Sequence, residues 1–88
     1  MNLEQILKRI EIASDHDDIR QRILTCGATH LAQDSSGEVF GYKGEPEHME
    51  YCDCDEWQSG SAPGARVVIF AAKLDAPENW KVAVWELP

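Results

Sequence analysis

The N-terminal segment carries apolar side chains at the spacing of an amphipathic α-helix. These positions lie three or four residues apart and therefore share one helix face: Leu3, Ile6, Leu7, Ile10 and Ala13. Asn2 precedes the segment and Gln5 follows three residues later, which is the spacing of a capping box at a helix start. The pattern predicts a helix that begins after Asn2.

A second helical pattern follows a polar break. Apolar residues recur between Ile19 and Leu24 at helical spacing, and Ser14 or Asp15 can serve as the N-cap. Gly27 lies where a left-handed residue would end this helix. Periodicity does not distinguish a short αα-hairpin from one bent helix, so both remain open.

From residue 28 the apolar period changes to that of a strand. Residues 28–34 and 38–44 flank a Ser-Ser-Gly turn, which predicts a β-hairpin with Gly37 at a position of positive φ. In the second strand Phe40 and Tyr42 share one face, because side chains alternate along a strand.

The last third of the chain predicts two more strands. Val67 to Ala72 is apolar without alternation, which is typical of a central strand that is covered on both faces. The side chains of residues 81–87 alternate between two faces, and this segment is expected to form a closing β-hairpin with the strand that contains Val67 to Ala72. A short last helix after Pro77 is the alternative. Trp80 and Trp85 are assigned to the sheet and to its core.

These elements predict an α+β fold with two N-terminal helices packed on an antiparallel sheet of about four strands. The 88 residues are expected to form a single domain, 1–88, that is helical over 1–27 and mainly β over 28–88. No apolar run is long enough to cross a membrane, and the amphipathic N-terminus does not fit a secretory signal. We therefore expect a cytoplasmic protein without a membrane partner.

The net charge of −8 is concentrated in the middle of the chain. Residues 28–64 hold eight acidic side chains and one basic side chain, so they contribute −7. This balance argues against direct binding of nucleic acid, because phosphates are bound by basic side chains. It is compatible with a basic partner, including a protein whose own groove binds nucleic acid. The alternative is that the acidity only keeps a small protein soluble.

The acidic residues are densest between Glu45 and Trp57, a segment named here the acidic stretch. Carboxylates steer a basic partner, and large aromatic side chains are frequent interface anchors. The predicted partner-binding residues are Glu45, Glu47, Glu50, Tyr51, Asp53, Asp55, Glu56 and Trp57. The alternatives are that the stretch is only a solvated connection or that residues 47–57 form a further edge strand.

The acidic stretch also contains two cysteines, which raises the question of a metal. The candidate ligands of such a site are Cys52, Cys54, His48, Cys26 and His30. Structural zinc is usually held by pairs with C-x2-4-C spacing, whereas this chain has one C-x-C pair and no second pair. We expect free thiols and no cofactor, with a zinc site as the alternative.

Enzymatic chemistry is not predicted. The chain has no phosphate-binding glycine loop and no nucleophile elbow. The thiols nearest a histidine lie among carboxylates, which disfavour the reactive thiolate. A non-enzymatic protein is therefore expected, with no catalytic residues.

Two segments carry a resemblance to a group of known proteins. With GATHLAQDSSGEVFGYKGEPE (27–47) and PENWKVAVWEL (77–87), the chain resembles small phage and prophage accessory proteins of uncharacterised function. The resemblance implies an accessory protein that acts inside an infected bacterium, where small acidic phage proteins often block nucleic-acid-binding host proteins, such as restriction or CRISPR machinery, by occupying their basic surfaces. A small zinc-binding domain and a phage structural or assembly component are the alternative functions.

Overall fold

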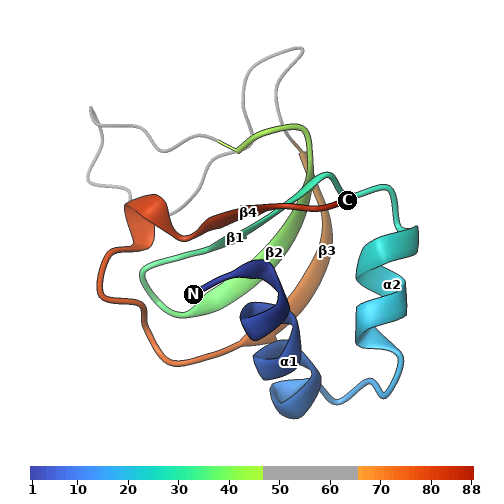
Figure 1. Ribbon diagram of the computed structural model, residues 1–88, viewed down its shortest axis with the longest axis horizontal. Helices are drawn as coiled ribbons and strands as arrows, with labels where there is room; N and C mark the ends of the chain where they lie inside the picture. The colour runs from blue at the N-terminus through green and yellow to red at the C-terminus, as the bar shows by residue number, and fades with distance from the viewer. Residues whose placement is uncertain (47–65) are drawn as a thin grey trace.

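The computed structural model describes residues 1–46 and 66–88. Two helices lie on the same side of an antiparallel sheet of four strands, which confirms the predicted α+β fold (Figure 1). The elements in chain order are α1 (Leu3–Ala13), α2 (Ile19–Thr25), β1 (His30–Gln33), β2 (Glu38–Lys43), β3 (Arg66–Lys73), the 3-10 helix η1 (Trp80–Val82) and β4 (Val84–Glu86). No helix within these residues has the length and apolar character needed to cross a membrane.

Helix α1 begins with the predicted capping box. The side-chain oxygen of Asn2 accepts a hydrogen bond of 2.9 Å from the backbone amide of Gln5, whose side chain accepts one of 2.8 Å from the amide of Asn2. The predicted apolar face is turned toward the sheet, with Ile6, Leu7 and Ile10 buried. This face supplies the apolar area that holds the helix in place, because an isolated helix of eleven residues is only marginally stable in water.

Helix α2 is a separate helix, so the αα-hairpin is correct and the single bent helix is wrong. The backbone leaves α1 at Ser14 in an extended conformation, and the Ser14 hydroxyl accepts a hydrogen bond from the amide of His16. The predicted N-cap at Ser14 or Asp15 is wrong as well. Asp18 occupies that position, because this local turn uses the Ser14 hydroxyl before the helix begins.

The strands lie in the order β3-β2-β1-β4. Strands β1 and β2 form the predicted hairpin, and its turn has Gly37 at φ = 100°. A Cβ atom at this glycine would lie 2.0 Å from the carbonyl oxygen of Leu74, so both the backbone conformation and the space require glycine. This contact ties the β1–β2 turn to the segment that follows β3.

Two predictions about the later strands are wrong. Strand β3 pairs only with β2 among the described residues and forms an edge of the sheet, not its centre. Val67 and Phe70 are 47% and 52% exposed, so the apolar run is not covered on both faces. The closing hairpin is also wrong, because β4 pairs with β1 at the opposite edge.

The connection from β3 to β4 explains the second error. The chain passes through η1, in which the Asn79 side chain accepts a hydrogen bond from the amide of Lys81. This turn carries the chain past β2 and β1 before β4 begins. The short helix after Pro77 and the strand that follows it therefore both exist, where the sequence pattern presented them as alternatives.

Apolar side chains occupy both faces of the sheet, but unequally. The helix-covered face is built from Ile6, Leu7, Ile10, Ile19, Ile23, Leu31, Val39, Ala71, Ala72 and Leu87. The opposite face buries Ala32 and Tyr42, with the partly buried Phe40, Trp80 and Val84 against them. Phe40 and Tyr42 lie together on this second face, as predicted. Trp80 lies in η1 and Trp85 in β4, and both side chains are partly buried.

Candidate interaction surface

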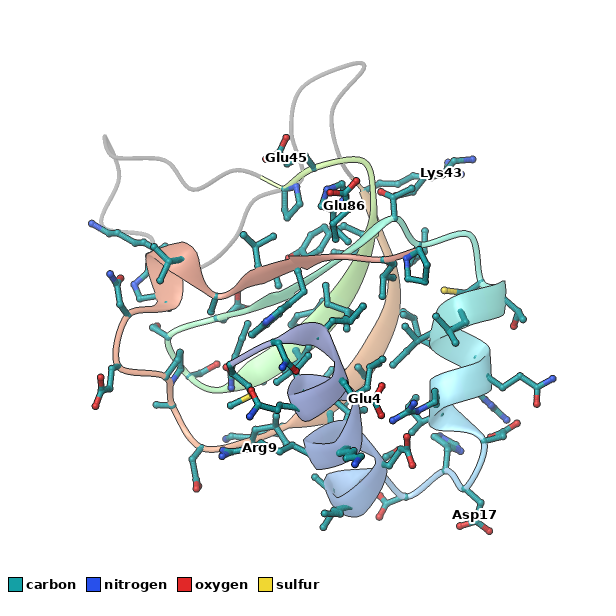
Figure 2. The ribbon with its side chains drawn as sticks, in the orientation of Figure 1. Glu4, Arg9, Asp17, Lys43, Glu45 and Glu86 are labelled. Carbon is teal, nitrogen blue, oxygen red and sulfur yellow. The ribbon has the colours of Figure 1, made fainter. Side chains whose placement is uncertain are left out.

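The acidic stretch begins where β2 ends. Glu45 is exposed and follows Gly44, whose φ of 96° turns the chain away from the strand. Figure 2 shows Glu45 at the same end of the sheet as Lys43 and Glu86. The other predicted contact residues lie outside the described residues; they are Glu47, Glu50, Tyr51, Asp53, Asp55, Glu56 and Trp57.

Thr29 fixes the point from which the stretch departs. Its hydroxyl accepts a hydrogen bond of 2.8 Å from the Gly44 amide and lies 2.8 Å from Nδ1 of His30. Its backbone amide donates to the carbonyl oxygen of Tyr42 at 2.7 Å, and its carbonyl oxygen accepts from the amide of Leu87 at 2.8 Å. Thr29 thereby links β2, β1 and the end of β4. These hydrogen bonds fix the backbone just before Glu45, the first residue of the acidic stretch.

A row of polar and titratable side chains crosses the sheet at this end. His30 of β1 lies opposite Tyr42 of β2 and opposite Glu86 of β4. Directly opposed residues on neighbouring strands share a face, so the three side chains lie on the face that carries no helix. Tyr42 is buried there, whereas Glu86 is exposed. The sequence pattern did not identify this row, because the pairing of β4 with β1 was not predicted.

Two basic side chains flank the segment between β2 and β3. Lys43 is the last residue of β2, Arg66 is the first residue of β3, and the two are paired across the strands. Like charges in this relation repel each other. An acidic side chain near them would relieve that repulsion.

The charges of the whole chain are strongly segregated. The described residues carry eight basic and eleven acidic side chains, a net charge of −3. Residues 47–65 carry five acidic side chains and no basic side chain, a net charge of −5. More than half of the excess negative charge therefore belongs to about a fifth of the chain, the segment that connects two neighbouring antiparallel strands.

The metal alternative has two candidate ligands within the described residues. Cys26 is an exposed free thiol at the end of α2, and its Sγ donates a hydrogen bond of 3.3 Å to the carbonyl oxygen of Ile23. His30 lies in β1 beside Thr29. Among the residues described here, no three histidine, cysteine or acidic side chains gather in a group that could hold a metal ion. His48, Cys52 and Cys54 lie outside the described residues, so the zinc alternative stays a prediction.

Among the described residues, two ion pairs join the two helices and a third lies at the start of α2. Arg20 of α2 forms ion pairs with Glu4 and Glu11 of α1. The hydrogen bond from the Arg20 guanidinium lowers the pKa of Glu4, and the two carboxylates together raise the pKa of Arg20. Arg22 similarly lowers the pKa of Asp18 through a side-chain hydrogen bond. The contacts of Arg20 join the two helices.

Arg9 is placed differently from Arg20 and Arg22. It forms no ion pair with a described residue, and it borders three open hollows of about 560, 430 and 450 Å³ on the helix side of the molecule. The first hollow is also lined by Lys73 and the exposed Ile12, and the second is also lined by Trp85. The side chains around Arg9 are mixed in charge and polarity, and none of the described ones forms a nucleophile–base pair of the kind that catalysis requires.

No protein family, curated protein or solved structure matches this chain.

Proposed function

We propose that this protein is a non-enzymatic protein-binding module that uses the acidic stretch as its contact surface. Its partner is a protein with a basic surface. The resemblance to phage accessory proteins points to a nucleic-acid-binding host defence protein in the bacterial cytoplasm, which the module would inhibit by covering the surface that binds nucleic acid.

The observation that carries this proposal is the segregation of charge. Residues 47–65 hold five acidic side chains and no basic one, so a basic partner would meet no repelling cation within this segment. Thr29 and the pairing of β2 with β3 fix both ends of the segment on one end of the sheet. A segment whose ends are fixed loses less conformational freedom on binding than a free tail would lose.

The proposal is tested by charge reversal within the stretch. The variant D53K/D55K/E56K changes the net charge from −8 to −2. The matched control D15K/D17K/E78K makes the same change at three exposed residues outside the stretch. Each variant is used to capture proteins from a lysate of the bacterial host, and the captured proteins are eluted with increasing salt.

The stretch variant is expected to lose a basic partner that the control variant retains. Elution of this partner should shift steeply with salt, because the screening length falls from about 10 Å at 0.1 M to about 3 Å at 1 M. Equal capture by both variants would contradict the proposal, and so would a partner that resists high salt. Circular dichroism of both variants verifies that the fold is retained.

A further inference from the structure

We draw no further inference here: the strongest candidate, the apolar patch of the half-exposed Val67 and Phe70 on the sheet face that carries no helix, is an unpartnered face, and nothing in the described part of the structure shows what covers it.

Discussion

The two faces of the sheet are built on different principles. The helix-covered face buries ten aliphatic residues, drawn from both helices, from strands β1, β2 and β3, and from Leu87 just after β4. The opposite face buries two residues and surrounds them with partly exposed aromatic side chains, among them Phe40 and Trp80. Dense aliphatic packing removes more apolar area from water, so the helix-covered face holds most of the folding energy.

The residues that supply most of the stability therefore differ from those of the proposed contact surface. The proposed contact surface begins at Glu45, at the end of the sheet that also carries the polar row at His30. Substitutions in these regions should change binding with little cost in stability. Substitutions beneath the helices should have the opposite effect. Three measurements of stability test how the folding energy is divided between the two faces.

The largest expected effect comes from the helix-covered face. Replacing Ile10 by alanine should reduce the free energy of unfolding by about 2–5 kcal/mol, because Ile10 is fully buried and its removal leaves a cavity. The matched control is Ile12 in the same helix, whose side chain is 86% exposed. Its replacement by alanine should change stability by less than about 0.5 kcal/mol. Urea unfolding measures both, and equal losses would show that α1 is not held by this face.

A smaller effect is expected on the opposite face. Phe70 is half exposed, and its ring packs edge-on against Phe40 at a centroid distance of 5.3 Å. Replacement by alanine should cost about 1–2 kcal/mol, the sum of a partly lost burial and a lost aromatic pair. Replacement by leucine keeps most of the apolar area and should cost less. A loss as large as that of Ile10→Ala would mean that both faces support the fold equally.

The sequence predicted the local elements well where a single segment contains the whole signal. The capping box at Asn2, the stripe on α1 and the glycine turn at Gly37 all depend on residues a few positions apart, and all are found in the structure. The order of the strands depends on contacts between distant segments. β3 and β4 were expected to pair because they are consecutive, but η1 carries the chain to the far edge.

The candidate surface was predictable in its charge but not in its geometry. The run of carboxylates is visible in the sequence, and its first member, Glu45, is exposed. The pairing of Lys43 with Arg66 and the row formed by His30 and Glu86 arise from sheet register, which no local pattern specifies. Strand β3 was expected to be central because its apolar run has no alternation, and composition alone does not show which side of a strand lacks a neighbour.

The smallest expected effect lies in the ion pairs at the rim of the helix-covered face. The Arg20 guanidinium holds the pKa of Glu4 below its ordinary value, so folding favours the charged carboxylate. This contribution is present above the carboxylate's unfolded pKa and is lost as the pH falls through the lower folded pKa. Replacing Arg20 by methionine should therefore lower the urea midpoint at pH 7 and leave a smaller difference at pH 3.

Arg22→Met provides the control for this last measurement. Arg22 lowers the pKa of Asp18 in the same way, but the two residues are four positions apart around the start of α2. Arg20 instead joins two helices, so its loss should lower the urea midpoint at pH 7 more than the loss of Arg22 does. Equal effects of the two substitutions would show that the ion pairs stabilise each helix separately. The packing of Ile6, Ile10 and Ile23 would then hold the helices together without electrostatic help.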